Sequence, residues 1–249
     1  GLPYLSLHTD PSIIWHGNKR NKILSSENLK QFPSIKNNIL DFGHAKLWCD
    51  QKWSKEFAGF LTRLTKEIDP QRIRIIEVHT PFNTSCDYLE DFIDTYKTFE
   101  EEVLKEFPSA EILIENMFNN DRKKRFGRFI LSTNKDIIKL SNLISESNLK
   151  LRLVLDIPQL LSEHNGGNKL LTEGMITDTL APLMKIRNYI KSTHIWGNEI
   201  NKIRGAHSCD FNTYFGGDEE LKKCFLEEIR QLFDDGKARY FVPEVGSTI

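Results

Sequence analysis

The chain has 249 residues and a formal net charge of −1, so its length suits a single domain and its charge indicates no particular partner. It has 39% hydrophobic residues but no apolar run long enough to cross a bilayer, and we expect no signal peptide. Cys49, Cys86, Cys209 and Cys224 form no C-x-x-C pair, so neither a cysteine zinc site nor a disulfide framework is indicated. We therefore expect an intracellular, cytoplasmic protein without membrane attachment, and the neutral charge counts slightly against a nucleic-acid enzyme.

Seven short, mostly apolar runs predict β-strands, and each ends at a residue that can bind a metal ion. The predicted strands are 1–7, 37–43, 74–78, 110–114, 151–155, 190–193 and 240–243. Their end residues are His8, His44, His79, Glu115, Asp156, His194 and Glu244. The run 112–114, just before Glu115, is typical of a strand covered on both faces.

The spacing of these strand ends indicates the architecture. They are separated by about 35 to 50 residues, the length of a strand followed by a helix and some loop. Stretches 88–106, 134–147 and 219–233 carry apolar residues at helical intervals. Alternating strands and helices form either an open parallel sheet or a closed barrel. Since only closure brings all carboxyl ends to one mouth, the pattern favours an α/β protein with the (β/α)8 TIM barrel.

Domain organisation follows from the same count. Only seven strands are predicted, and few residues follow the last of them. We therefore expect a single barrel domain over residues 1–249, with one strand missing or irregular, and we interpret the chain as a domain cut from a longer one.

Several aromatic and histidine residues have an ordinary structural interpretation. A histidine in a strand-to-helix loop is more often structural than a ligand, so we leave His8 out of the predicted site. His44 and His79 taken singly would be interpreted in the same way, but as members of a set at equivalent strand ends they are predicted ligands. Trp48 and Trp53 suit either the core or a platform at the barrel mouth.

Six short motifs carry a resemblance to a known family. They are LDFGHA (40–45), EVHTP (77–81), LIENM (113–117), VLDIPQ (154–159), THIW (193–196) and VPEV (242–245). From about residue 38 to its end, the chain resembles the endonuclease IV family of apurinic/apyrimidinic endonucleases and the related ultraviolet-damage endonucleases. Both belong to the xylose-isomerase-like barrel superfamily, also called the AP endonuclease family 2 superfamily.

The resemblance implies a set of metal ligands. His44, His79 and Glu115 would bind one ion. The ligands of a second ion would be Glu115, Asp156, His194 and Glu244. Glu115 would then bridge the two ions and act as the catalytic group that positions or deprotonates water. Imidazole and carboxylate ligands together suit Zn²⁺ or Mn²⁺ better than Mg²⁺, which prefers an oxygen shell.

The chain departs from the family pattern in two places. The family has a histidine three residues after the aspartate of the fourth motif, where this chain has Gln159, and an amide is a poor zinc ligand. The family also has an Asp-x-His pair further on, and the nearest candidates here are His207 and Asp210. We predict His207 as a further ligand and assign Gln159, Asp210 and Arg204 to substrate binding. A complete third metal site is not expected.

Three functions are consistent with these patterns. The first is a metal-dependent phosphodiesterase or endonuclease that acts on abasic or damaged DNA through a two-metal site. The second is an isomerase or epimerase of a small sugar, which in this superfamily uses one metal and needs neither His44 nor His79. Its ligands would be Glu115, Asp156, His194 and Glu244. The third is a barrel that has lost catalysis and serves as a binding domain.

Overall fold

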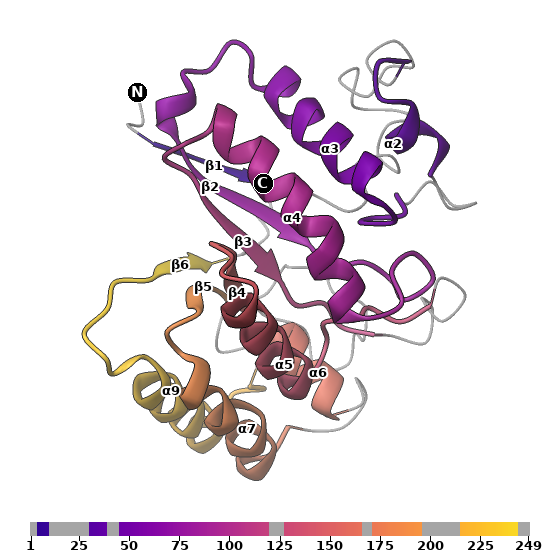
Figure 1. Cartoon of the computed structure of the whole chain (residues 1–249). Coiled ribbons are helices and arrows are strands. Elements are labelled where there is room, and N and C mark those ends of the chain that lie inside the picture. The colour runs from indigo at the N-terminus through magenta and orange to yellow at the C-terminus, as the bar shows by residue number, and fades with distance from the viewer. Residues whose placement is uncertain are drawn as a thin grey trace. The chain divides into compact units, whose positions relative to one another are not determined.

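The computed structural model (Figure 1) describes residues 4–9, 30–38, 45–119, 127–165, 171–195 and 215–243. The contacts within the chain divide it into two compact units. Unit 1 comprises residues 1–114, 122–131 and 142–152, and unit 2 comprises residues 115–121, 132–141 and 153–249. In both units strands alternate with helices along the chain.

Unit 1 begins with a parallel strand pair and is rich in long helices. Its elements are β1 (Leu5–His8), α2 (Pro33–Asn37), α3 (Gln51–Leu64), η3 (Pro70–Arg72), β2 (Ile73–His79), α4 (Leu89–Glu106) and β3 (Glu111–Glu115), of which the last residue belongs to unit 2. Strand β1 pairs with β2 in parallel, with His8 opposite Glu77, and β3 is the next neighbour of β2. The register therefore brings the ends of β1 and β2 together.

An aromatic core joins α3 to α4 in unit 1, where the two helices pack against each other (Figure 1). Helix α3 begins after Asp50, whose carboxylate accepts the Trp53 N–H at 2.6 Å as an N-cap. Trp48 and Trp53 are each 1% exposed, so they belong to the core. The ring of Trp48 makes edge contacts with Phe57 and Phe99, and its Nε1–H donates to the carbonyl oxygen of His79 at 2.8 Å. The core thus holds the end of β2 directly.

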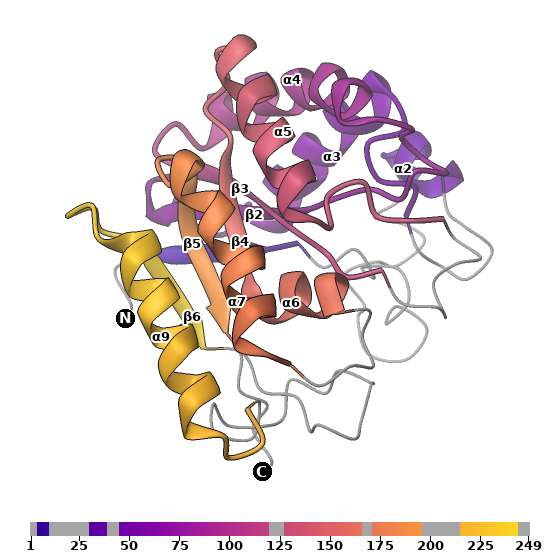
Figure 2. The ribbon, with the colours of Figure 1, turned by 90° about the horizontal axis from the view of Figure 1, so that it is seen from below.

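Unit 2 contains three parallel strands and a pair of packed helices. Its elements are α6 (Ile157–Asn165), α7 (Glu173–Leu180), η5 (Ala181–Ile186), β5 (Ile190–Ile195), α9 (Glu219–Phe233) and β6 (Tyr240–Pro243). Helix α5 (Asn134–Glu146) and strand β4 (Arg152–Asp156) have residues in both units. Figure 2 shows α7 and α9 side by side, and α7 also packs against α6.

The strand register in unit 2 aligns two residues that can bind a metal ion. Strands β4 and β5 are parallel, with Asp156 opposite His194, and β5 pairs with β6 in parallel, with His194 opposite Val242. Parallel strands deliver their carboxyl ends to the same edge. Asp156 and His194 therefore lie at the same level of the sheet.

The structure confirms much of the predicted order of elements. Six predicted strands correspond to β1 to β6, and the helices predicted at 88–106, 134–147 and 219–233 correspond to α4, α5 and α9. The core of β3 is buried as expected, with Ile112, Leu113 and Ile114 at most 1% exposed. The strand predicted at 37–43 begins at Asn37, which instead ends α2, and its remaining residues except 38 lie outside the described part.

These observations confirm the α/β class. The strand pairs β1–β2, β4–β5 and β5–β6 are all parallel. The described residues contain six strands, fewer than the eight of a closed barrel, so barrel closure and the single domain over 1–249 stay predictions. None of the described helices is both long and apolar enough to cross a membrane.

Candidate metal centre

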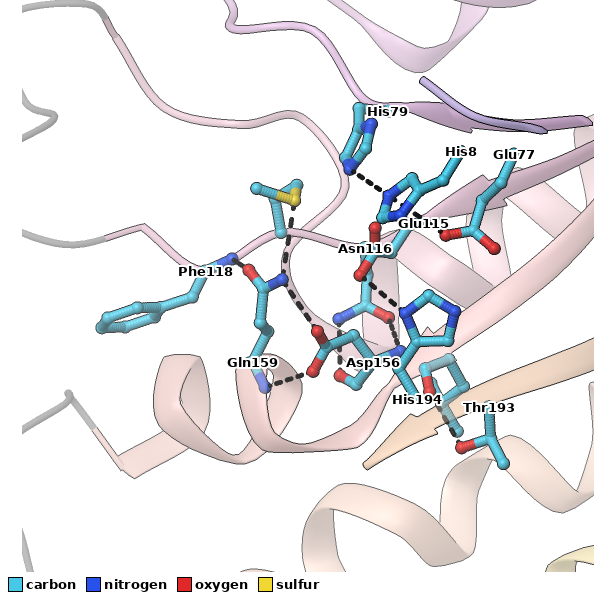
Figure 3. A network of polar contacts seen from close by, with 12 residues as sticks. His8, Glu77, His79, Glu115, Asn116, Phe118, Asp156, Gln159, Thr193 and His194 are labelled. Carbon is cyan, nitrogen blue, oxygen red and sulfur yellow. Dashed lines mark hydrogen bonds and ion pairs between the residues drawn. The ribbon is translucent and has the colours of Figure 1, made fainter. Parts of the chain in front are cut away.

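In unit 1, three side chains that can bind a metal ion meet at the ends of β1 and β2. We call His8, Glu77 and His79 the unit-1 cluster (Figure 3). Glu77 and His79 are two residues apart on β2, so their side chains share one face. His8 Nε2 lies 3.2 Å from His79 Nε2 and 3.4 Å from Glu77 Oε1, and the two imidazole rings are stacked at 4.9 Å between centroids.

The protonation of His79 follows from its neighbours. Its Nδ1 contacts the carbonyl oxygen of Thr9, which can only accept, so Nδ1 carries the proton and Nε2 presents a lone pair. Thr9 is itself held in place, because its N–H and its hydroxyl both donate to the carbonyl oxygen of Glu77, at 3.0 and 2.7 Å. This arrangement is typical of a metal-binding histidine, in which the second ring nitrogen is bonded to a carbonyl group.

The two distances measured from His8 are those of pairs of ligands on one metal ion. Two ligands of one tetrahedral Zn²⁺, each bonded at about 2.0–2.1 Å, come about 3.3–3.4 Å apart. The separations of His8 Nε2 from His79 Nε2 and from Glu77 Oε1 are 3.2 and 3.4 Å. The side chain of His8 is 46% exposed, which leaves it accessible to water, whereas that of Glu77 is 5% exposed.

Unit 2 holds a second, fully buried set. We call Glu115, Asp156 and His194 the unit-2 cluster, and their residues are at most 2% exposed. Glu115 Oε1 lies 3.3 Å from His194 Nδ1, again the separation expected of two ligands of one ion (Figure 3). Both units therefore carry buried histidine and glutamate side chains that could bind a metal ion.

Asp156 lies in a dense hydrogen-bond network within unit 2. Its Oδ1 accepts the backbone N–H of Gln159 at 2.9 Å, which caps the first turn of α6, and its Oδ2 accepts from Gln159 Nε2 at 2.9 Å. The side-chain amide of Asn116 pairs with the backbone of Asp156, accepting from its N–H at 2.9 Å and donating to its carbonyl oxygen at 3.0 Å. Figure 3 shows this network.

Five of the predicted site residues lie in the described part of the chain. The structure brings His79 against His8, Glu115 against His194, and Gln159 against Asp156. The other five lie outside the described residues: His44, Arg204, His207, Asp210 and Glu244. The ligand roles, the bridging role of Glu115 and the assignment of Gln159 to substrate binding stay predictions.

Three residues of the site were missed by the sequence patterns. His8 was set aside as structural, but it is in contact with His79. Glu77 belongs to a Glu-x-His pattern that places both side chains on one strand face, and this signal could have found it. Asn116 directly follows Glu115, and no local pattern indicates that it pairs with Asp156.

Comparison with known proteins assigns no family. No family model matches this chain, and no curated protein matches it.

Proposed function

We propose that the protein is a metal-dependent hydrolase that cleaves phosphodiester bonds in DNA at abasic or damaged sites, in the manner of the endonuclease IV family. One observation carries the proposal: imidazole and carboxylate groups gather at the carboxyl ends of strands in both units. These groups belong to His8, Glu77 and His79 in unit 1 and to Glu115, Asp156 and His194 in unit 2.

The chemistry of these groups selects the metal. The two clusters together contain three imidazoles and three carboxylates, a set that suits Zn²⁺ or Mn²⁺ better than Mg²⁺. A bound ion of this kind would supply Lewis-acid chemistry, activating water and offsetting charge on a phosphate group. We assign one ion to each cluster, so the chain would bind two.

The residues of the chain have separate tasks in this proposal. The bond from His79 Nδ1 to Thr9 directs Nε2 towards His8, so both rings could bind the same ion. Glu115 is the catalytic group, because a carboxylate held in a buried site can position water and accept its proton. Burial of both Glu115 and His194 excludes bulk water, which strengthens electrostatic interactions between them and a charged substrate.

DNA is proposed as the substrate because of the motifs around the clusters. The segments EVHTP and LIENM contain His79 and Glu115, and these segments resemble the endonuclease IV family. A damaged nucleotide would have to leave the base stack to reach such a site, as enzymes that act on single nucleotides in a duplex require.

The test joins metal analysis to an activity assay. The full chain, purified without chelator, should contain two Zn²⁺ or Mn²⁺ ions and should cleave a duplex with one abasic site. His79→Ala and His194→Ala should each lose metal and cleavage. His164→Ala is the matched control, because His164 accepts the backbone N–H of Asn134 and belongs to neither cluster. A wild-type chain that binds no metal would refute the proposal.

A single-metal sugar isomerase is the second candidate, favoured by one observation. The unit-2 cluster contains a glutamate, an aspartate and a histidine from three successive strands, which are three of the four ligands that this branch of the superfamily uses. The fourth, Glu244, lies outside the described residues. This hypothesis predicts one ion per chain, which His194→Ala should lose and His79→Ala should keep. It also predicts proton exchange at a sugar carbon next to a carbonyl group.

A further inference from the structure

We propose that Gln159 is a positioning residue that orients the carboxylate of Asp156 for metal binding. The inference rests on the proposed function, because it treats Asp156 as a metal ligand. Gln159 lies in the first turn of α6 and reaches both oxygens of Asp156, one through its backbone N–H and the other through its side chain. A carboxylate held at both oxygens by one residue cannot rotate without breaking a bond.

The orientation of the Gln159 amide is determined by a backbone group. The N–H of Phe118 lies 2.8 Å from one terminal atom of this amide, and an N–H can only donate, so that atom is the carbonyl oxygen Oε1. The other terminal atom is therefore the NH₂ group, which faces Asp156 Oδ2 at 2.9 Å. The contact is thus a donated hydrogen bond, which requires Asp156 to offer a lone pair there.

These bonds suit a carboxylate that also binds a metal ion. An ionised carboxylate has about four lone-pair sites, and Gln159 is directed at two of them. Asp156 is fully buried, and a buried charge is stable only when it is hydrogen-bonded or paired. Donors from Gln159 offset part of this charge, and a bound cation would offset more of it.

Gln159 also connects Asp156 to the segment that follows Glu115. Phe118 donates to Gln159, and one helical turn later Glu163 Oε2 accepts the N–H of Asn119 at 2.8 Å. These two side chains, four residues apart, lie on the same face of α6. Residues 118 and 119 are therefore held by α6, the helix that begins directly after Asp156.

Glu163 provides a matched control for this inference. Like Gln159, it accepts a backbone N–H from the 118–119 segment at 2.8 Å, from Asn119 rather than from Phe118. A variant at Glu163 therefore loosens the segment while leaving the two bonds from Gln159 to Asp156 in place. A variant at Gln159 loosens the segment and also removes the side-chain bond to Asp156.

The experiment measures Zn²⁺ affinity of the full chain by competition with a chelator, together with thermal unfolding of the metal-free chain. Gln159→Met should lower the Zn²⁺ affinity of the unit-2 cluster by about 10- to 100-fold, as expected when the partner of a metal ligand is removed. Glu163→Met should lower the melting temperature comparably and leave the dissociation constant unchanged. A wild-type dissociation constant in Gln159→Met, or an equal loss in both variants, overturns the inference.

A second variant decides the case if Gln159→Met does not fold. Gln159→Glu keeps an acceptor for Phe118 but replaces the donor to Asp156 with a like charge, so it too should bind Zn²⁺ more weakly. Binding as tight as in the wild type overturns the inference. The proposed function fails separately, in a wild-type chain that binds no Zn²⁺ or Mn²⁺ at all.

Discussion

The two units hold the side chains of their clusters in different ways. In unit 1 two imidazoles and one carboxylate meet, and the His8 side chain is 46% exposed. In unit 2 the carboxylate of Glu115 meets the imidazole of His194, Asp156 is aligned with His194 in the sheet, and all three residues are buried. In unit 1 the carbonyl oxygen of Thr9 orients the ring of His79, whereas in unit 2 the side chains of Asn116 and Gln159 bond to Asp156.

The bonds to Asp156 reflect the cost of burying charge. A neutral imidazole needs one acceptor and one donor or metal, which a carbonyl group such as that of Thr9 can partly supply. A buried carboxylate carries a full charge and must be hydrogen-bonded or paired. In unit 2 Gln159 supplies two such bonds to the Asp156 carboxylate, whereas in unit 1 the carbonyl oxygen of Thr9 accepts a bond from His79. A metal ion would complete the compensation of charge in unit 2.

The largest expected effect comes from neutralising the unit-2 cluster. Glu115→Gln keeps the shape of the side chain and removes the charge beside His194. Cleavage of abasic DNA should fall by several orders of magnitude, because the catalytic group and a metal ligand are lost together. Single-turnover cleavage and metal content of the variant test this. Full cleavage with both ions retained would show that Glu115 neither bridges nor catalyses.

The two histidines of the unit-1 cluster should differ in their contribution. His79 is buried and bonded to Thr9, whereas the side chain of His8 is nearly half exposed. We expect His79→Ala to abolish binding of the unit-1 ion and His8→Ala to weaken it, since water can replace an exposed ligand. Zinc titration of both variants measures this difference. Equal losses would show that exposure has no influence on the strength of this site.

Asn116 in unit 2 and Thr9 in unit 1 should contribute differently to the free energy of unfolding. Asn116→Leu leaves two buried backbone groups of Asp156 without their partner, at a cost of about 1–3 kcal/mol for each. Thr9→Val removes only a hydroxyl bond, since the Thr9 N–H still donates to Glu77, and should cost about 1 kcal/mol. Urea denaturation of the metal-free chains compares them. A larger loss in Thr9→Val would contradict the contrast between the units.

The smallest expected effect concerns His164, which lies outside both clusters. Burial lowers the pKa of His164 from its usual 6.5, so below that pH the unfolded chain binds more protons at this position than the folded chain. Its contribution to stability is therefore lost as the pH falls from 6.5 towards the folded pKa. His164→Gln should slightly flatten the fall of the unfolding free energy between pH 7 and pH 5. Denaturation at several pH values tests this, and cleavage at pH 7.5 should not change.

Local sequence patterns predicted most of the elements, because the buried apolar residues of a helix or strand recur along the chain with the period of that element. The apolar run before Glu115 and the helical spacing of 88–106 are examples, and they correspond to β3 and α4. Helices α3 and α6 were not singled out by these patterns. In α6 the reason is physical: the helix begins at Ile157 with no loop after β4, so one apolar stretch contains the end of a strand and the start of a helix.

The sequence by itself placed residues that can bind a metal ion at the ends of predicted strands, because the end of a strand is a local feature of the chain. Which of them meet was decided by the tertiary structure. His8 and His79 are 71 residues apart and come together only through the pairing of β1 with β2. Gln159 could be recognised as an unusual residue, but its amide is oriented by Phe118, 41 residues away. A hydrogen bond to a distant backbone group leaves no periodic signal in the sequence, so only the folded chain reveals it.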